Sequence, residues 1–510
     1  MKNRRDFIKT ISVLPLIPAV YNGERLGIVP LSKNKMSDVS FPELGTIHKK
    51  TPKEFATSPF GIGCETLDRE LWDPKEIYPW MDDLPVKWAR LQTGWARVEK
   101  EKGKYDWKWL DESIDGLLIR GFIPFLNVGF GNTNYSEGGM HPPKNNTESN
   151  NAWKAFIKAL AIRYKNKIRY FEIWNEPNLT SWWLPGKPDA GEYEELTRET
   201  AQIIRKNCPG AKIIGGVLSQ LPFSFIRSLF ENGLGKEIDI FSFHPYGVLP
   251  ESYNEQVKAL RKLIDKYNPE IIIWQGETGY PSEPGSSGYR GEAPWSETIQ
   301  AKIMLRRLIT DCSLGMDVAI WFLIVDLHDY PKGSGRVNYK GILRTKPRVE
   351  PKIAFSVLQN LGSTIYGDVS VRNAIIHCSE STQENPDDKF KRLFGTGAGL
   401  GLEMTMPEVY SCMLNTEGGK IMAYWETVKA ADDFPAKNID ILLSDCEGNG
   451  FEEPVLVDLM TGSIFSLGNS FVQKNDAAKW SIIYGAQTFN NLPLRDYPML
   501  IVEKRNALPA

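Results

Sequence analysis

One stretch of this sequence decides the fold: Ile168-Arg169-Tyr170-Phe171-Glu172-Ile173-Trp174-Asn175-Glu176-Pro177-Asn178. Its first seven residues are mostly apolar, β-branched or aromatic, which is typical of a buried strand. Pro177 has no N–H to donate and disfavours helix at the residue before it, so the strand must end at Glu176. The carboxyl ends of parallel strands are where (β/α)8 barrels hold their catalytic groups. A lone glutamate at a strand end is more often a solvated loop residue, so this one needs a partner.

A second carboxylate stands in the same kind of position. Glu277 follows the apolar run Ile271-Ile272-Ile273-Trp274-Gln275-Gly276, and the small residues around it allow a ligand to approach closely. Counted along the chain, Glu176 closes the fourth strand and Glu277 the seventh, so both project into one mouth from opposite sides of a ring. Cleavage of a glycosidic bond needs such a pair. One carboxyl protonates the leaving oxygen, and the other attacks or stabilises the anomeric carbon.

Strands and helices alternate with few gaps between residues 60 and 361. Predicted strands occupy 60–65, 86–91, 122–128, 168–174, 212–217, 238–243, 270–275 and 317–325. Predicted helices occupy 75–83, 107–120, 152–165, 192–206, 256–267, 296–314 and 351–361. Eight strands alternating with helices predict an α/β fold, a closed (β/α)8 or TIM barrel. A doubly wound open sheet is the alternative, but no Gly-rich phosphate loop follows the first strand.

The pattern changes beyond about residue 364, where short alternating stretches are separated by Gly, Asn and Asp turns. These stretches are 369–376, 409–415, 420–427, 439–444, 455–458 and 499–503. They predict an all-β sandwich packed against the barrel. The 510 residues are therefore expected to hold a catalytic barrel at 36–362 and a C-terminal accessory sandwich at 363–510. The segment 41–58 is a candidate to lend the sandwich a strand.

The N-terminus resembles a twin-arginine export motif, Asn3-Arg4-Arg5-Asp6-Phe7-Ile8-Lys9, followed by a modest apolar run from Ile11 to Val20. That run is too short to cross a bilayer as a helix, so it indicates an export signal rather than a membrane anchor. Residues 1–35 are expected to be signal and spacer, and the protein to be exported to the periplasm or secreted. An ordinary basic N-terminus is the alternative.

Composition excludes several classes of function. Hydrophobic residues make up 42% and charged residues 24% of the chain, as in ordinary globular proteins. The net charge of −2 gives no reason to bind nucleic acid or an anionic membrane. The six cysteines are dispersed without a CxxC pair, which excludes a zinc ribbon and predicts unpaired thiols. With no HExxH motif, no clustered Cys or His and no nucleotide loop, the sequence predicts neither a metal nor a cofactor, and the expected partner is a carbohydrate substrate.

Three segments carry a family resemblance: Tyr170 to Trp183, Trp88-Ala89-Arg90 with Trp95, and Phe243-His244-Pro245-Tyr246. They resemble the retaining glycoside hydrolases of clan A, and glycoside hydrolase family 39 most closely. The resemblance covers about residues 58 to 360. At the seventh strand, Gly-Glu-Thr-Gly replaces the Thr-Glu-Trp type of sequence associated with that family.

The resemblance implies roles for the two glutamates and for two of their neighbours. Glu176 would be the general acid/base and Glu277 the nucleophile. Arg90, at the end of the second strand, would be the cation that keeps the nucleophile ionised. Asn175 would bind the 2-hydroxyl group of the sugar. The pairing of Arg90 with a structural acid is the alternative.

Further residues are candidates for binding substrate. By the same resemblance, Tyr246 would hold an oxygen of the nucleophile and His244 would orient the site. Trp321 on the eighth strand would offer a platform for the sugar ring. The alternative for His244 is an ordinary core histidine, and the alternative for Trp321 is barrel packing. Glu172 is expected to be structural. The loops after the third and fourth strands add Asn132, His141, Trp182 and Trp183 as candidate subsite residues.

The sequence thus predicts an exported retaining glycoside hydrolase with a (β/α)8 barrel and an accessory β-sandwich. A transglycosidase with the same residues and a catalytically silent carbohydrate-binding barrel are the alternatives. β-Xylosides are the substrates that the resemblance implies first. A second basic residue beside the pocket would favour an acidic sugar, and the sequence alone places none there.

Overall fold

The computed structural model describes residues 40–508 apart from 145, 248, 289–293, 382–407, 436, 449 and 474–485. The expected export signal and spacer lie outside these residues, so they stay predictions. Within the described part of the chain, no helix is long and apolar enough to cross a membrane. All six cysteines lie in this part, and each is unpaired.

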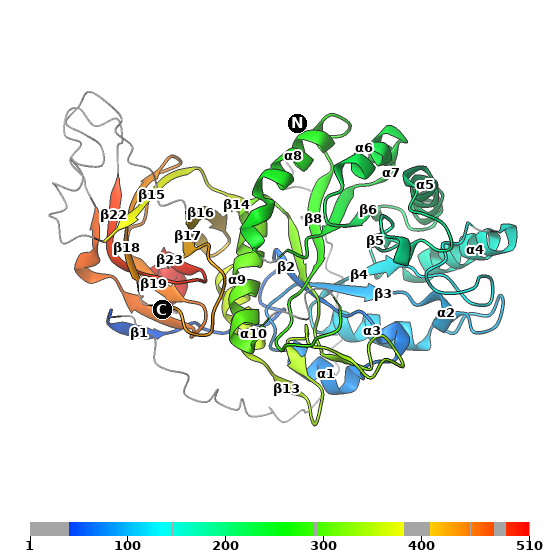
Figure 1. Ribbon diagram of the computed structural model, residues 1–510, viewed down its shortest axis with the longest axis horizontal. Coiled ribbons are helices and arrows are strands. Elements are labelled where there is room, and N and C mark those ends of the chain that lie inside the picture. Colours follow the sequence, from blue (N-terminus) through cyan, green and yellow to red (C-terminus); the bar gives the residue numbers. More distant parts are fainter. Residues whose placement is uncertain are drawn as a thin grey trace.

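In the described ranges, eight parallel strands close into a barrel in their chain order (Figure 1). Their bounds are β2 (Phe60–Gly63), β3 (Trp88–Gln92), β4 (Ile123–Val128), β5 (Tyr170–Ile173), β6 (Lys212–Ser219), β7 (Ile240–His244), β8 (Ile272–Thr278) and β9 (Val318–Trp321). The last strand, β9, pairs with the first, β2, and so closes the ring. The barrel predicted from the alternation is confirmed, and the open doubly wound sheet is excluded.

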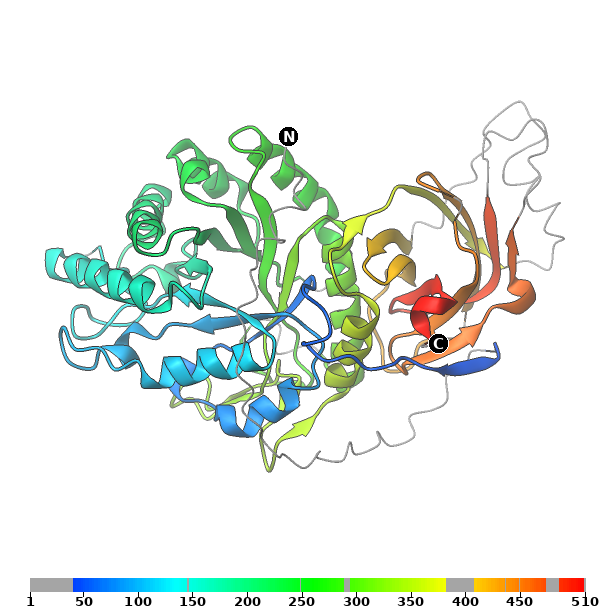
Figure 2. The same ribbon diagram turned by 180° about the vertical axis from the view of Figure 1, so that it is seen from behind.

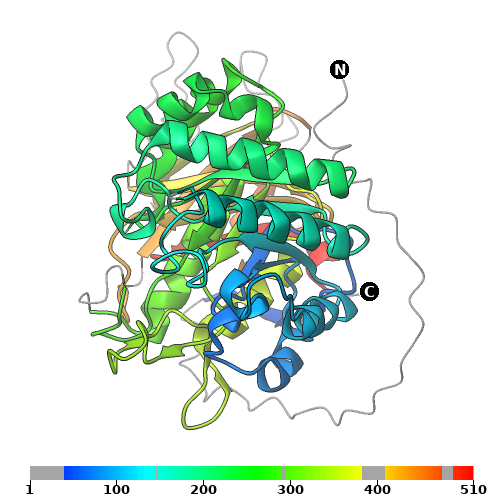
Figure 3. The same cartoon turned by 90° about the vertical axis from the view of Figure 1, so that its right-hand side faces the viewer.

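Helices cover the outside of the barrel. In Figure 3 the helices coloured cyan to green lie in front of the strands. The main ones are α1 (Pro74–Met81), α3 (Lys108–Ile119), α4 (Thr147–Tyr164), α5 (Ala190–Asn207), α6 (Phe223–Glu231), α8 (Asn254–Asp265), α9 (Glu297–Ser313) and α10 (Ile353–Thr364), with short turns at α2 (Trp95–Val98) and α7 (Leu234–Glu237). The helix α4 begins earlier than predicted because the Asn146 side chain caps it, accepting a hydrogen bond from the Ser149 N–H.

The eighth barrel strand is shorter than the sequence predicts. It ends at Trp321, whereas the apolar run continues to Val325. Residues 322–325 are also buried, but they follow the strand as irregular backbone, and Val325 forms an isolated bridge with Leu343. The apolar run therefore indicates that these residues are buried. It does not show that they form a strand, because a buried connection has the same composition.

The C-terminal part forms two antiparallel sheets. Among the described residues, a seven-stranded sheet has the order β1-β20-β19-β23-β17-β16-β14 and a four-stranded sheet the order β15-β18-β22-β21. Their bounds are β1 (Glu43–Thr46), β14 (Ser370–Val371), β15 (Ala374–Glu380), β16 (Val409–Thr416), β17 (Gly419–Glu426), β18 (Lys437–Asp445), β19 (Pro454–Asp458), β20 (Ser463–Ser466), β21 (Phe471–Gln473), β22 (Gln487–Leu494) and β23 (Met499–Glu503). Strand β1, which precedes the barrel in sequence, pairs with β20.

The predicted strand at 369–376 is two strands that belong to different sheets. β14 pairs with β16, whereas β15 pairs with β18. Arg372 lies between them, and its guanidinium donates to both carboxylate oxygens of Asp445 on β18. The alternating pattern runs through both strands, so only the pairing reveals where the chain changes sheet.

The helices α9 and α10 lie between the barrel strands and the C-terminal sheets (Figures 1 and 2). Residues 300–312 of α9 are buried, and the charges on this helix are paired. Arg306 donates to both carboxylate oxygens of Glu251 at 2.8 Å and to Val428 O at 2.6 Å. Lys302 Nζ lies 2.8 Å from Asp496. Because unpaired buried charges are costly, these pairs favour one fixed packing of the barrel on the sandwich.

Candidate active site

Glu176 follows β5 in a turn whose backbone is held in an uncommon conformation. Trp174 and Glu176 have positive φ values of 64° and 44°, which residues other than glycine rarely adopt. Hydrogen bonds fix the turn: Asn127 Nδ2 donates to Trp174 O at 2.7 Å, and the Glu176 N–H donates to Val217 O at 2.8 Å. Val217 lies where the pairing of β6 shifts register. A constrained backbone therefore aims the Glu176 side chain.

Glu277 lies within β8, where pairing with β9 shifts register between Gln275 and Thr278. A shift of this kind redirects a side chain. The preceding residue must be small, because a Cβ at Gly276 would stand 2.1 Å from Ser242 Oγ. The sequence prediction gave this small residue a role in ligand approach. In the structure it admits a side chain of the neighbouring strand instead.

Arg90 on β3 is fully buried and joins the parts of the site. Its Nη1 donates to Glu277 Oε2 at 2.6 Å and to Glu65 Oε1 at 3.1 Å. Its Nε donates to Glu172 Oε2 at 2.7 Å, and its Nη2 donates to Asn175 Oδ1 at 2.9 Å. The structure thus brings Arg90 to Glu277 and Asn175. It leaves Glu172 fully buried beneath them as a partner of the same guanidinium.

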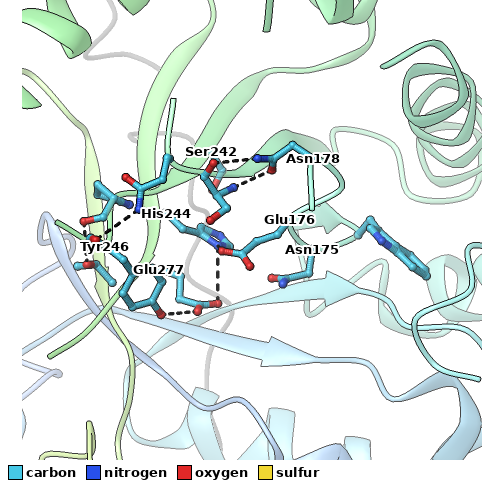
Figure 4. Close-up of polar contacts among 12 residues, drawn as sticks. Asn175, Glu176, Asn178, Ser242, His244, Tyr246 and Glu277 are labelled. Carbon is cyan, nitrogen blue, oxygen red and sulfur yellow. Dashed lines mark hydrogen bonds and ion pairs between the residues drawn. The ribbon is translucent and has the colours of Figure 1, made fainter. Parts of the chain in front are cut away.

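His244 and Tyr246 complete the contacts of the two glutamates. His244 Nδ1 lies 3.1 Å from Glu176 Oε1 and 3.9 Å from Glu277 Oε2. Tyr246 donates its hydroxyl to Glu277 Oε1 at 2.5 Å, and Figure 4 shows these side chains gathered around the His244 ring. His244 Nδ1 is close to both carboxylates. The facing oxygens of Glu176 and Glu277 therefore cannot be as far apart as the upper part of the ~6.5–9.5 Å range that separates the carboxyl groups of inverting enzymes.

The charges around Glu277 favour its ionised form. Burial alone would raise the pKa of this carboxyl. The charges on His244 and Arg90 overcome burial and, with the Tyr246 hydroxyl, hold the pKa of Glu277 below its ordinary value. Burial lowers the pKa of His244, but Glu277 and Glu176 raise it above its ordinary value. Glu277 is therefore an ionised carboxylate with fixed partners at neutral pH.

Comparison with known proteins shows which enzymes the chain resembles. The family model described as Glycosyl hydrolases family 39 matches residues 88–314, a span that begins in β3 and contains both Glu176 and Glu277. A β-xylosidase of Caldicellulosiruptor saccharolyticus is 28% identical to this chain over 358 residues, which are 61% of this chain and 70% of the relative. The chain is a glycosidase that is similar to glycoside hydrolase family 39.

Solved structures share the fold of this glycosidase. A family 39 glycoside hydrolase from the gut symbiont Bacteroides cellulosilyticus WH2 has a TM-score of 0.60 at 16% identity, over 90% of this chain and 83% of that one. A monomeric β-xylosidase from Caulobacter crescentus CB15 has a TM-score of 0.54 at 18% identity, over 90% of this chain and 97% of that one. Matches of this extent take in the C-terminal sheets as well as the barrel.

Two tryptophans that were predicted to bind sugar are packing residues in the structure. Trp321 is fully buried and its Nε1 donates to Lys340 O at 3.3 Å, so neither face of the indole is open to a sugar. Trp183 is 2% exposed, and its Nε1 donates to Glu192 Oε2 at 3.1 Å. The predicted sugar contacts of Trp321 and Trp183 are therefore wrong, because the flat faces that a sugar needs are covered by protein.

Asn132 supports the loop after β4 rather than the two glutamates. It is 1% exposed, its Nδ2 donates to Glu99 O at 3.0 Å, and its Oδ1 accepts from the Asn134 N–H at 2.9 Å. A long loop must satisfy its own buried polar groups, and the Asn132 side chain serves that need. The predicted role of Asn132 in substrate binding is corrected accordingly. His141 is partly buried, with Nε2 3.8 Å from a carboxylate oxygen of Glu137, and its role in substrate binding stays a prediction.

Two buried charged residues near the pair were not predicted from the sequence. Glu65 follows β2 just as Glu176 follows β5, so its strand-end position was a usable signal. Burial raises the pKa of Glu65 to about 7, against the attraction of Arg90 and with repulsion from Glu277. Lys340 comes from the loop after β9 and had no such signal. It is 3% exposed.

The raised pKa of Glu65 predicts a pH dependence of the stability of this protein. A carboxyl whose folded pKa lies above its unfolded value near 4.5 stabilises the fold below pH 4.5, and this contribution is lost as the pH rises through about 7. In Glu65→Gln the group stays neutral, so the loss is absent. The free energy of unfolding of the variant should gain on wild type by up to about 3 kcal/mol between pH 4.5 and 7.5. Denaturant titrations at several pH values measure it, and parallel curves would contradict the prediction.

Proposed function

We propose that the chain hydrolyses O-glycosidic bonds of oligo- or polysaccharides by a retaining double displacement. The observation that carries this is the contrast between two glutamates that meet at His244. Glu277 has the ionic and hydrogen-bonding partners of a nucleophile. Among the described residues, the Glu176 carboxylate has only His244 as a side-chain hydrogen-bond partner. It is therefore the freer of the two to exchange a proton with a leaving group.

In the first step, a carboxylate oxygen of Glu277 attacks the anomeric carbon while the bond to the leaving oxygen breaks. The proton of Glu176 passes to that oxygen, so the departing group leaves as a neutral alcohol. Arg90 and Tyr246 hold Glu277 in place and cover the lone pairs that do not attack. The product of this step is a glycosyl ester on Glu277.

In the second step, Glu176 acts as a base, takes a proton from water, and the oxygen of that water attacks the anomeric carbon. The ester bond to Glu277 breaks and the carboxylate returns to its ionised form. Asn175 supports both steps: its Oδ1 accepts from Arg90, which leaves the Nδ2 hydrogens free of any partner in the described residues. These hydrogens are suited to the 2-hydroxyl group of the sugar, a contact that strengthens in the transition state.

β-Xylosides are the first substrates to test, because the similar proteins from Caldicellulosiruptor saccharolyticus and Caulobacter crescentus CB15 are β-xylosidases. With 4-nitrophenyl β-xyloside, the first sugar product detected by proton NMR should be the β-anomer, before mutarotation mixes the forms. An α-anomer as first product would overturn the retaining mechanism. Binding of sugars without turnover of any aryl glycoside would favour a silent carbohydrate-binding barrel. Transfer to added sugar in preference to water would favour a transglycosidase.

A further inference from the structure

The ammonium group of Lys340 is held beside the catalytic pair. The residue lies in the loop that follows β9, where its N–H donates to Asn338 Oδ1 at 3.2 Å and its carbonyl accepts from Trp321 Nε1 at 3.3 Å. These bonds fix the backbone from two sides. The side chain is 3% exposed, so its position is set by packing rather than by solvent.

The environment of this ammonium group is aromatic. Lys340 Nζ lies 4.6 Å from the centre of the Tyr246 ring and 6.0 Å from the centre of the Phe322 ring. The hydroxyl of the same Tyr246 binds Glu277. Within the described residues, no carboxylate lies within 4.0 Å of Nζ and no hydrogen bond from Nζ is present. A buried ammonium group without an ionic partner among the described residues is costly, and this one lies against the ring whose hydroxyl binds Glu277.

The charge of Lys340 helps to hold the pKa of Glu277 low, but it ranks behind His244, Arg90 and the Tyr246 hydroxyl in that role. Glu277 already has the guanidinium of Arg90 at 2.6 Å, which is closer than any contact that Lys340 makes. The Tyr246 ring beside Nζ binds Glu277 through its hydroxyl, so the ammonium lies on the nucleophile side of the pair. Glu277 bonds to the glycone, the sugar whose linkage is cut, and the glycone is therefore the part of a substrate that Lys340 meets.

We propose that Lys340 makes the glycone site selective for a sugar that carries an anionic substituent, a carboxylate or a sulfate ester. This inference rests on the proposed function, because it places the glycone at Glu277. An ammonium group is a compact point charge with three donors, which suits either anion. The burial that makes the unpaired charge costly in the free enzyme also strengthens its attraction for a bound anion. Burial lowers the pKa of Lys340 to about 8, and the charges of Glu277 and Glu176 oppose that effect, so the group remains mostly protonated at pH 7.

The matched substrates are 4-nitrophenyl β-D-xyloside and 4-nitrophenyl β-D-glucuronide, which differ only by the carboxylate at C5. The β-D-galacturonide adds a second acidic stereoisomer. The β-D-glucoside and its 6-sulfate form a second pair, which separates a sulfate from a carboxylate. At least one anionic member should exceed its neutral counterpart about tenfold or more in kcat/KM.

In Lys340→Met, the kcat/KM for the preferred anionic substrate should fall by about 10- to 100-fold, mainly through KM, as expected for a lost charge-assisted hydrogen bond. The neutral substrates should change less than about threefold. Lys340→Arg keeps the charge and should keep most of the preference. Lys332→Met removes an exposed lysine from the same loop and should change nothing. Thermal unfolding of each variant separates a lost contact from a lost fold.

A measurement that does not depend on turnover separates this inference from the proposed function. Calorimetric titration of wild type and Lys340→Met compares free D-xylose with D-glucuronate, D-galacturonate and D-glucose 6-sulfate. A preference for an anion that disappears in the variant supports the site even if no aryl glycoside is cleaved, in which case only the proposed function fails. Cleavage with retention but no anion preference overturns the inference alone. An equal loss on all substrates in Lys340→Met also overturns it, because Lys340 would then only support the catalytic pair.

Discussion

Replacing Glu277 by alanine should abolish turnover of every glycoside, whatever its leaving group. In the proposed mechanism the variant lacks the group that bonds to the anomeric carbon, and a good leaving group cannot replace it. We expect kcat to fall by roughly 10⁵- to 10⁶-fold, as for other covalent nucleophiles. Initial rates with 4-nitrophenyl and 2,4-dinitrophenyl glycosides measure the loss, and the two substrates should lose activity alike.

Azide offers a sharper test of this assignment. In Glu277→Ala, azide can occupy the space of the lost carboxylate and attack the sugar from that face, so the glycosyl azide should have the inverted configuration. Glu137→Ala is the control, because Glu137 belongs to the loop after β4 and its side chain is 89% exposed. Residual activity within about a hundredfold of wild type would show that another residue is the nucleophile.

Replacing Glu176 by alanine should have an effect that depends on the leaving group. In the proposed mechanism this carboxyl donates a proton to the departing oxygen, a contribution worth ~10²–10⁴-fold. A 2,4-dinitrophenolate leaves without protonation, so the variant should form the glycosyl ester at nearly the normal rate. The ester should then break down slowly, because the base is missing. A burst of dinitrophenol and a low apparent KM are the expected signs in stopped-flow and steady-state assays.

The same azide test applies to Glu176→Ala with the opposite stereochemical result. Azide needs no base, so it should accelerate breakdown of the ester and give a glycosyl azide of retained configuration. Retention here and inversion in Glu277→Ala would together assign both carboxyls. If both variants lose activity equally on activated and unactivated substrates, with no burst and no azide product, the assignment of roles is wrong.

The barrel and the meeting of Glu176 and Glu277 at one rim could be predicted because both depend on local pattern. Glu176 and Glu277 each follow an apolar run that small residues or proline bring to an end. Parallel strands of one barrel have their carboxyl ends at one rim. Once the alternation of strands and helices was recognised, it followed that the two carboxylates share that rim. Glu65 carried the same strand-end signal and was overlooked.

The predictions failed where they depended on the direction of a side chain or on pairing. Trp321 lies on the predicted strand, but both faces of its indole are covered. Asn132 lies in the predicted loop, but it bonds to the backbone at Glu99 instead of facing the pair. The stretch 369–376 reads as one strand and is divided between two sheets. An apolar or polar pattern indicates whether a side chain is buried. It does not indicate which other residues the side chain contacts.

By itself, the sequence determined that strands alternate with helices and that two glutamates stand near the carboxyl ends of their strands. Only the tertiary structure decided how those glutamates differ. Glu277 meets Arg90 and Tyr246, Glu176 meets His244, and Lys340 arrives from a loop far along the chain. The physical reason is range. The alternation of strand and helix is set by neighbouring residues, whereas the charge and burial around a carboxylate depend on segments that only the closed barrel brings together.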